Sequence, residues 1–289
     1  MNKVLITGAT GLLGKSLVSY LKNVGHNVVT HARTGGADFL VDLADSDKSF
    51  DMLSRIQPDI VINLVSLTNV ELCQDQPNLA YLANTRSVEN LTNWILQTGA
   101  NCHLIQISTD HLYDGNGLQS EDQIKLTNSY AFSKYAGEMA ATRVPSTILR
   151  TNFFGHSKVP HRESITDWVF SSLTLGKSIQ VFDDVFFSPL SMVTLAEIID
   201  LVLERKPIGT FNLGSHNGMS KADFNYYFSD CLGLPTNNMT RIKSHEAMFL
   251  KTYRPKDMRM NCAKFENLLQ VQLPSLMDEI KLVAGEYHD

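Results

Sequence analysis

The chain has 289 residues, of which 43% are hydrophobic and 19% are charged, and its formal net charge at pH 7 is −5. This composition is typical of a globular protein, and no run of lysine and arginine collects on one predicted helix, which argues against a nucleic-acid partner. No apolar run approaches the roughly 20 residues that span a bilayer, so we expect no membrane partner. The four cysteines are scattered and no signal-peptide cleavage pattern is present, which predicts a reduced, cytoplasmic protein.

The first predicted strand, Lys3–Thr7, is followed by a glycine-rich turn and a helix with leucines on one side. The turn reads Gly-x-x-Gly-x-x-Gly between strand and helix. Glycine is needed where the backbone turns sharply and approaches a pyrophosphate, and the amides at a helix start attract the anion. The motif therefore predicts a dinucleotide site. Its expected cofactor contacts are Gly8, Thr10, Gly11, Leu12, Leu13 and Gly14.

The second predicted strand, Asn27–His31, is followed by Arg33 and has no acidic residue near its tip. In dinucleotide folds an acid at this point holds the ribose 2′-hydroxyl, whereas an arginine accommodates a 2′-phosphate. Arg33 therefore favours NADPH, with NADH as an alternative; a solvated loop arginine is the other interpretation. Further cofactor contacts are expected after the third strand, Phe39–Val41, and the fourth, Asp59–Asn63. They are Asp42, Leu43, Leu64, Val65 and Ser66.

The fifth predicted strand, His103–Ile107, ends at Ser108 and Thr109, and a helical pattern then places Tyr130 and Lys134 one turn apart on one face. A tyrosine with a pKa of about 10 is a poor proton donor near neutrality unless a nearby ammonium favours its phenolate. A hydroxyl from the strand end can share the substrate oxygen. The pair is therefore a candidate acid with its tuning group, although a lone Tyr-x-x-x-Lys also fits an exposed helix pair.

Strands and helices alternate up to the sixth strand, Thr147–Arg150, which predicts an α/β fold with a Rossmann-like doubly wound parallel sheet. Beyond it we expect a smaller, discontinuous α/β substrate domain, with the helix Val193–Leu203 and the strand near Thr210 returning to the sheet. The predicted NADP-binding domain comprises 1–155 and about 190–215, and the substrate-binding domain about 156–189 and 216–289. Other predicted elements are helices at Pro77–Gln97, Ile165–Leu175 and Ser220–Leu232 and a strand at Ile179–Phe182.

The glycine turn, Ser108-Thr109-Asp110, Tyr130-x-x-x-Lys134 and Arg254-Pro255 together resemble the extended short-chain dehydrogenase/reductases that act on nucleotide sugars. Within that class the chain looks most like the dTDP-4-dehydrorhamnose reductase family. The supporting runs are Asn63–Glu71, Ser108–Gly115, Tyr130–Glu138, Leu149–Phe153, Asp183–Pro189 and Arg254–Met260. The resemblance thus covers nearly the whole chain.

The resemblance implies NADPH-dependent reduction of the 4-keto group of a nucleotide-diphospho-4-keto-6-deoxyhexose, in deoxysugar or polysaccharide precursor synthesis. Tyr130 would protonate the carbonyl oxygen, Thr109 would hydrogen-bond it, and Lys134 would lower the tyrosine pKa and bind the nicotinamide ribose. Ser108 and Tyr130 would also contact the cofactor, and Arg254 the nucleotide diphosphate. The expected substrate contacts are Thr68, Val70, Asp110, His111, Asn152, Phe153 and Arg254. A homodimer is one option, and no histidine or cysteine spacing marks a metal site.

Departures from the family affect the sugar more than the reaction. His111 replaces a tyrosine, Phe153 replaces a tryptophan, and the run Asp184–Leu190 lacks the glutamine, glycine and threonine of the family. The loop Gly155–Arg162 carries several basic side chains that could close over a diphosphate or be solvated.

Three alternative functions stay open. A 4,6-dehydratase needs an Asp-Glu pair after the threonine, where this chain has Asp110-His111. The run Arg254–Asp257 is also similar to the Arg-Pro-x-Asp of nucleotide-sugar epimerases. The regulatory subunit of methionine adenosyltransferase resembles the same family and works through partner contact, although the intact Thr109, Tyr130 and Lys134 set argues against a purely regulatory role.

Overall fold

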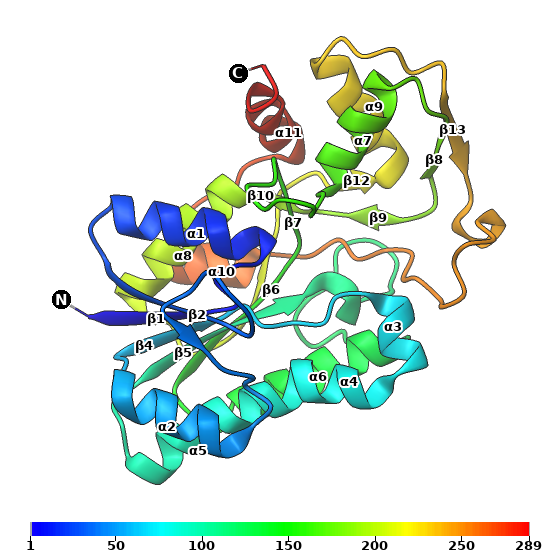
Figure 1. Cartoon of the computed structure of the whole chain (residues 1–289). Coiled ribbons are helices and arrows are strands. Elements are labelled where there is room, and N and C mark those ends of the chain that lie inside the picture. The colour runs from blue at the N-terminus through cyan, green and yellow to red at the C-terminus, as the bar shows by residue number, and fades with distance from the viewer. Residues whose placement is uncertain (1, 289) are drawn as a thin grey trace. The chain divides into compact units, whose positions relative to one another are not determined.

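The computed structural model describes residues 2–288, and the chain divides into two compact units, each with its own helices and strands (Figure 1). Unit 1 comprises Met1–Thr109, Asn128–Arg150 and Ala196–Phe211, and unit 2 comprises Asp110–Thr127, Thr151–Leu195 and Asn212–Asp289. The assignment of the cofactor to one domain and of the substrate to the other stays a prediction.

Unit 1 is built on a seven-stranded sheet with the strand order β11-β6-β5-β4-β1-β2-β3. The strands are β1 (Lys3–Thr7), β2 (Asn27–Ala32), β3 (Phe39–Leu40), β4 (Ile60–Asn63), β5 (His103–Thr109), β6 (Ser146–Thr151) and β11 (Gly209–Leu213). The pairs β1–β2, β1–β4, β2–β3 and β4–β5 are parallel. Chain order reverses between β1 and β4, and ligands of such sheets bind at the carboxyl ends of the strands beside that point. The predicted doubly wound fold is confirmed.

Helices cover both faces of this sheet, with α1 and α8 on one face and α2, α5 and α6 on the other (Figure 1). Their bounds are α1 (Leu12–Asn23), α2 (Ser46–Ile56), α3 (Val70–Asp75), α4 (Pro77–Tyr81), α5 (Ser87–Thr98), α6 (Ser129–Ala141) and α8 (Met192–Arg205). The predicted single helix Pro77–Gln97 is interrupted by a π-helical turn at Leu82–Arg86. The core between sheet and helices includes Leu5, Val61, Leu91, Leu104 and Ile148.

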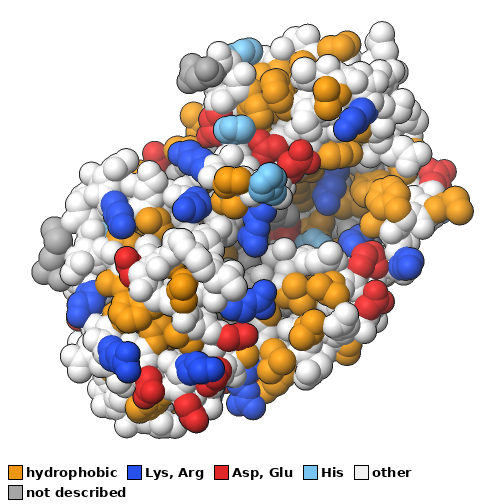
Figure 2. Space-filling model, viewed as in Figure 1, with side chains coloured by type: hydrophobic (Ala, Val, Ile, Leu, Met, Phe, Trp, Pro, Cys, Tyr) orange, Lys and Arg blue, Asp and Glu red, His pale blue; other side chains and the backbone are white. Residues whose placement is uncertain are grey.

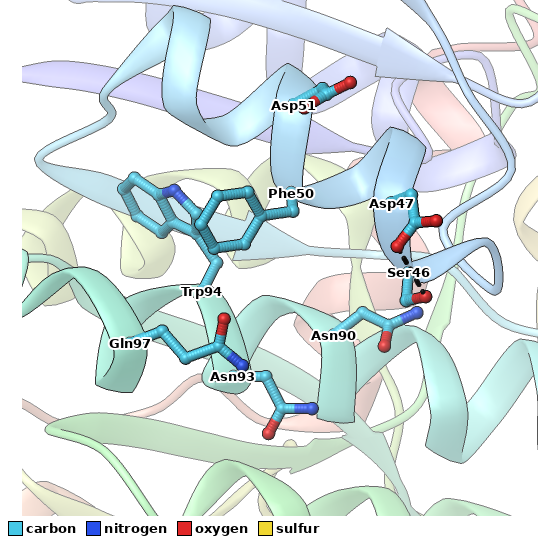
Figure 3. A pocket seen from close by; sticks show the side chains of 8 residues that line it. All are labelled: Ser46, Asp47, Phe50, Asp51, Asn90, Asn93, Trp94 and Gln97. Carbon is cyan, nitrogen blue, oxygen red and sulfur yellow. Dashed lines mark hydrogen bonds between the residues drawn. The ribbon is translucent and has the colours of Figure 1, made fainter.

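Helices α2 and α5 leave a pocket of about 430 Å³ between them (Figure 3). Its lining is Ser46, Asp47, Phe50, Asp51, Asn90, Asn93, Trp94 and Gln97, none of which is a predicted site residue. The Trp94 side chain is buried, and its Nε1 donates to Ser54 Oγ at 3.1 Å. Asn90 Nδ2 donates to the Leu43 carbonyl at 2.7 Å. Trp94 thus ties α5 to α2, and Asn90 ties α5 to the segment that precedes α2.

Unit 2 contains three two-stranded sheets: β10 with β7, β12 with β9, and β13 with β8. The strands are β7 (Phe153–Phe154), β8 (Ile179–Phe182), β9 (Phe186–Phe187), β10 (Leu190–Ser191), β12 (Met219–Ser220) and β13 (Met239–Ile242). The helices are α7 (Ile165–Thr174), α9 (Lys221–Cys231), α10 (Ala263–Leu269) and α11 (Leu276–Gly285), with short 3₁₀ turns at Asp110–Leu112 and Ser244–Glu246. Aromatic side chains form its core; Phe154 and Phe224, for example, pack edge to face at 4.8 Å between ring centroids.

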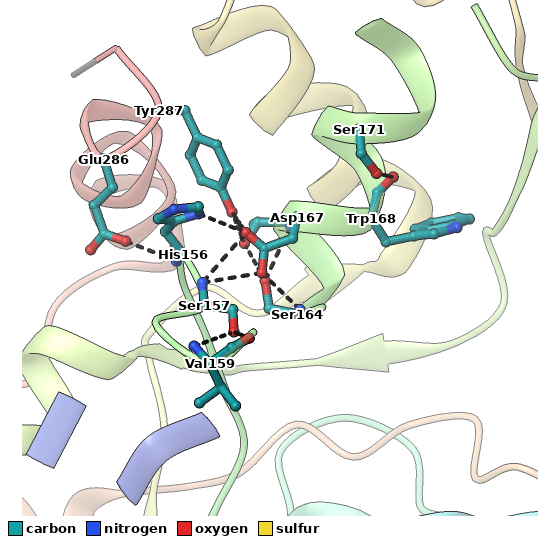
Figure 4. A network of polar contacts seen from close by, with 10 residues as sticks. His156, Ser157, Val159, Ser164, Asp167, Trp168, Ser171, Glu286 and Tyr287 are labelled. Atoms are coloured by element: carbon teal, nitrogen blue, oxygen red, sulfur yellow. Dashed lines mark hydrogen bonds and ion pairs between the residues drawn. The ribbon is translucent and has the colours of Figure 1, made fainter. Parts of the chain in front are cut away.

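A polar network ties the carboxyl-terminal end of α11 to the start of α7 (Figure 4). The Tyr287 hydroxyl donates to Asp167 Oδ1 at 2.7 Å, and His156 Nδ1 lies 2.8 Å from the same oxygen. Asp167 also accepts from the Ser164 amide and so completes the capping box of α7. These bonds hold the pKa of Asp167 below its usual value although burial opposes them. His156 in the basic loop is thus bound within the network.

Positive and negative side chains are interspersed on the face that Figure 2 shows. An anionic ligand on this face would therefore be held by a few placed groups rather than by a broad positive field. None of the helices in residues 2–288 combines the length and apolar character that a bilayer crossing requires. In the same part of the chain, no three histidine, cysteine, aspartate or glutamate side chains come together as metal ligands.

Candidate active site

The glycine turn leads from β1 into α1 and has the geometry that a dinucleotide phosphate needs. Gly8 has a φ of +70°, a conformation that side chains disfavour. A Cβ on Gly14 would lie 2.5 Å from the Gly8 carbonyl oxygen, so only glycine lets the helix start so close to the turn. Gly11 is the N-cap of α1 and offers no side chain to the first amides of the helix. These amides can therefore bind an anion.

Buried amide side chains fix the strand ends beside this turn. Thr7 Oγ1 donates to Asn63 Oδ1 at 2.6 Å, and Asn63 Nδ2 donates to Gln106 Oε1 at 2.7 Å. The bonds link the carboxyl ends of β1 and β4 to the middle of β5. A Cβ on Gly8 would lie 3.1 Å from the carbonyl carbon of Leu64, so the glycine turn is packed against the segment after β4.

The predicted contacts after β4 and β3 differ in their surroundings. Leu64, Val65 and Ser66 are half-buried, and Ser66 Oγ donates to Asn84 Oδ1 at 3.1 Å. The exposed Asp42 accepts from the Ala44 amide at 3.0 Å. Leu43 is buried in the core, which leaves its backbone rather than its side chain for a cofactor.

Arg33 follows β2 and is exposed, and within residues 2–288 no carboxylate forms an ion pair with it. An acid that the sequence interpretation missed lies near this strand. The carboxylate of Asp38 accepts from the amide and the hydroxyl of Thr30 at 2.8 and 2.7 Å. These bonds lower the pKa of Asp38. They also engage Asp38 Oδ2 with β2 itself.

The three predicted catalytic residues are buried in unit 1. Thr109 is the last residue of β5, and Tyr130 and Lys134 lie one turn apart in the first half of α6. The helix starts where it does because the Asn128 side chain caps it, accepting from the Ala131 amide at 2.9 Å. α6 thus presents both side chains from one rigid element.

Lys134 Nζ donates to the Ile107 carbonyl of β5 at 2.8 Å. This bond ties α6 to β5 two residues before Thr109. Burial lowers the pKa of Lys134 to about 8, and the charge of Glu138 opposes that effect. Most Lys134 side chains are therefore protonated at pH 7, as a group that favours a phenolate must be.

A buried ion pair lies beneath this group. Arg150 Nη2 contacts Glu138 Oε2 at 2.7 Å, and Arg150 Nε contacts both carboxylate oxygens at 3.0 and 3.2 Å. The Ser108 hydroxyl donates to Glu138 Oε1 at 2.5 Å. Ser108, predicted as a cofactor contact, therefore also links the end of β5 to α6.

The predicted substrate residues fall in both units. In unit 1, Thr68 is exposed, whereas Val70 is buried in a cluster with Tyr130. In unit 2, Asn152 Nδ2 donates to Asp110 Oδ2 at 2.8 Å. The side chains of Phe153 and Arg254 are half-buried, and Arg254 Nη1 donates to the Thr252 carbonyl at 3.2 Å.

His111 is half-buried, and its pKa is lowered to about 3 by burial and then by the charges of Lys221 and Arg254. Its imidazole is therefore neutral near pH 7. A group with so low a pKa is rarely protonated at that pH, so His111 is a weak candidate for the proton donor.

Comparison with known proteins supports the same classification. The RmlD substrate binding domain family matches residues 1–288. The chain belongs to this family. It is a member of the extended short-chain dehydrogenase/reductases, a class of NAD(P)-dependent enzymes, as the sequence predicted. The predicted relationship is likewise confirmed at the level of the family: the chain is related to glycan and polysaccharide biosynthesis reductases that are similar to dTDP-4-dehydrorhamnose reductase.

Two curated relatives and one solved structure illustrate the similarity. The probable low-salt glycan biosynthesis reductase Agl14 of Haloferax volcanii is 26% identical, with 98% of each chain covered. Methionine adenosyltransferase 2 subunit beta of Pongo abelii is 25% identical over 92% of this chain and 82% of its own. The fold is similar to that of dTDP-4-dehydrorhamnose reductase from Bacillus anthracis in complex with NADP, with a TM-score of 0.89, 22% identity and 99% of each chain covered.

Several polar residues of this family member were missed by the sequence interpretation. They are Asp38, Asn84, Gln106, Glu138 and Lys221. Asn84 holds the segment after β4 by accepting from the Leu67 amide at 2.7 Å. A signal for Gln106 was available, because an amide in the middle of an apolar strand must find a hydrogen-bond partner.

Proposed function

We propose that the chain is an NADPH-dependent reductase that converts the 4-keto group of a nucleotide-diphospho-4-keto-6-deoxyhexose to a hydroxyl group. The observation that carries this proposal is the hydrogen bond from Lys134 Nζ to the Ile107 carbonyl. It holds the buried ammonium of Lys134 near the end of β5, and Lys134 lies on the same helix as Tyr130. That arrangement suits acid catalysis at an oxygen near Thr109.

The cofactor fits the residues that would hold it. The uncapped start of α1 and the close approach at Gly14 leave room for a pyrophosphate, and Arg33 would meet a 2′-phosphate. Bound NADPH would supply a hydride to the carbonyl carbon. Asp38 does not argue strongly for NADH, because its Oδ2 is already bonded to Thr30.

Tyr130 would donate its hydroxyl proton to the carbonyl oxygen, and Thr109 would donate a hydrogen bond to that oxygen. The positive charge of Lys134 would stabilise the phenolate that remains on Tyr130. Arg254 would bind the nucleotide diphosphate, where a guanidinium offers two parallel donors. The assignment of these roles rests on the family motifs and on the burial of the three groups in unit 1.

The test is NADPH consumption, followed by absorbance, with a panel of 4-keto-6-deoxy sugar nucleotides. Tyr130→Phe should lose about a hundred to ten thousand fold in turnover while still binding NADPH, since only the hydroxyl is removed. Tyr135→Phe on the same helix is the matched control and should keep the parental rate. If Tyr130→Phe stays within a few fold of the parent, another group supplies the proton.

A regulatory subunit is the second candidate, because methionine adenosyltransferase 2 subunit beta matches most of the chain. The same assay separates the two functions. Binding of NADPH without its oxidation in the presence of any keto sugar of the panel would favour a regulatory role.

A further inference from the structure

Lys221 occupies an unusual place in unit 2. It is the first residue of α9 and follows β12 directly, and β12 pairs antiparallel with β9. Its amide donates to the Val185 carbonyl at 2.8 Å, so α9 starts beside the Val185 end of β9. The Lys221 ammonium lies 5.8 Å from the centroid of the Phe187 ring.

The segment after Arg254 pairs with the other edge of β9. The Phe186 amide donates to the Lys256 carbonyl at 2.7 Å, and this segment runs parallel to β9. Arg254, two residues before Lys256, therefore lies toward the same end of β9 as Lys221. Neighbouring strands are about 4.8 Å apart. The backbone at Lys221 and the backbone at Arg254, on opposite edges of β9, are therefore about 10 Å apart, a distance that lysine and arginine side chains can bridge.

His111 lies close to both cations. The Lys256 amide donates to Asp114 Oδ1 at 2.8 Å, which brings the segment that carries His111 beside the segment that carries Arg254. Besides burial, repulsion from the positive charges of Lys221 and Arg254 disfavours protonation of the His111 imidazole. The three side chains thus belong to one cluster in unit 2.

The charge on Lys221 is poorly compensated within the protein. Its side chain is half-buried, and burial lowers its pKa, while Asp110 raises it and Arg254 lowers it again. Nevertheless no carboxylate within residues 2–288 forms an ion pair or hydrogen bond with its ammonium. A lysine in the first turn also opposes the helix dipole, which favours anions at that end.

A partly desolvated ammonium without an acceptor costs free energy unless an anion binds it. We infer that Lys221 binds a phosphate group of the nucleotide-sugar diphosphate, with Arg254 as the second cation of the same site. The inference rests on the proposed function for the identity of the ligand. The Lys221 ammonium is a compact point charge, whereas the Arg254 guanidinium offers two parallel donors. The two side chains can therefore bind the two adjacent phosphate groups of a diphosphate.

The experiment measures binding of dTDP, UDP, GDP and ADP by isothermal titration calorimetry, with the uncharged nucleosides as references. Lys221→Met keeps the length of the apolar stem and removes the charge. It should weaken binding of the preferred nucleoside diphosphate about ten to a hundred fold, the range of a hydrogen bond to a charged group. Lys281→Met, an exposed lysine on α11, is the matched control and should bind like the parent.

Two further readouts exclude a folding defect. Lys221→Met should leave the NADPH dissociation constant unchanged, and its melting temperature should equal or exceed the parental value because an uncompensated charge is removed. The affinity of the parent for the diphosphate should also fall with salt more steeply than that of the variant.

Unchanged diphosphate affinity in Lys221→Met would overturn the inference. So would a parent that binds no nucleoside diphosphate. The two proposals can fail separately. If none of the keto sugars supports NADPH oxidation by the parent, but the parent binds a diphosphate through Lys221, the proposed reaction is wrong and the inference stands.

Discussion

The Glu138–Arg150 ion pair provides a quantitative test of how the end of β5 is held. Both side chains are almost fully buried, with exposed fractions of 0% and 3%. Glu138→Gln keeps the shape of the side chain and removes the charge that faces the guanidinium. Breaking a buried pair by neutralising one partner typically costs about 3 to 5 kcal/mol, because the other charge stays buried. For a unit of this size, 1 kcal/mol lowers the melting temperature by about 2 to 4 °C, so we expect a fall of about 10 °C.

The assay is thermal unfolding followed by circular dichroism, with Glu89→Gln as the control. Glu89 also pairs with an arginine, Arg86, at 3.2 Å, but the two side chains are 26% and 43% exposed. Exposed pairs contribute about 0 to 1 kcal/mol, so the control should shift the melting temperature by at most a few degrees. The two carboxylates thus differ mainly in burial.

A double variant separates the charge from the packing. Glu138→Gln combined with Arg150→Met should be more stable than Glu138→Gln alone, because no uncompensated charge is left in the core. The reasoning is refuted if Glu138→Gln and Glu89→Gln melt within about 2 °C of each other. It is also refuted if the double variant melts at or below the temperature of Glu138→Gln alone.

Two other predictions concern the cofactor and the proton. Arg33→Ala should narrow the difference between the NADPH and NADH dissociation constants, measured by fluorescence titration, because the exposed guanidinium would bind only a 2′-phosphate; equal affinities in the parent would contradict this. The turnover number for keto-sugar reduction should fall as the pH rises through about 8, where Lys134 loses its proton. A turnover number that is constant from pH 7 to pH 9 would exclude a role for the charged form of Lys134.

The sheet of unit 1 was predictable because its strands are local apolar runs. Central parallel strands are buried on both faces, so they appear in the sequence as short uninterrupted hydrophobic segments. The sixth strand, predicted at Thr147–Arg150, spans Ser146–Thr151 in the structure. The glycine turn was equally readable, because the close approach at Gly14 depends on residues only six positions apart.

The π-helical turn at Leu82–Arg86 could not be predicted from periodicity. The apolar pattern continues from α4 into α5, and π turns have no strong local signal. The turn carries Asn84, whose Nδ2 donates to the Leu67 carbonyl at 3.1 Å and to the Ser133 hydroxyl at 2.9 Å. The irregularity thus serves contacts with segments distant in the sequence.

In unit 2, β8 spans Ile179–Phe182 as predicted, but the sheet of β9 and β12 was not predictable, for a related reason. β9 and β12 have two residues each, too few for any alternation, and each exists only because its partner is present. Lys221 lies in no family motif, and its neighbours become apparent only when β9 joins the segments on either side.

This difference between the units has a consequence for specificity. Thr109, Tyr130 and Lys134 depend on one strand and one helix that local patterns specify strongly, so substitutions there disturb the sheet or the chemistry. Lys221 and Arg254 instead come from separate segments that meet at β9. If Lys221 and Arg254 bind the diphosphate as proposed, a substitution on one such segment changes ligand binding while the sheet of unit 1 stays intact. We therefore expect membership of the family to constrain the reaction more tightly than the sugar, in agreement with departures at His111 and Asp184–Leu190 beside an unaltered Tyr-x-x-x-Lys.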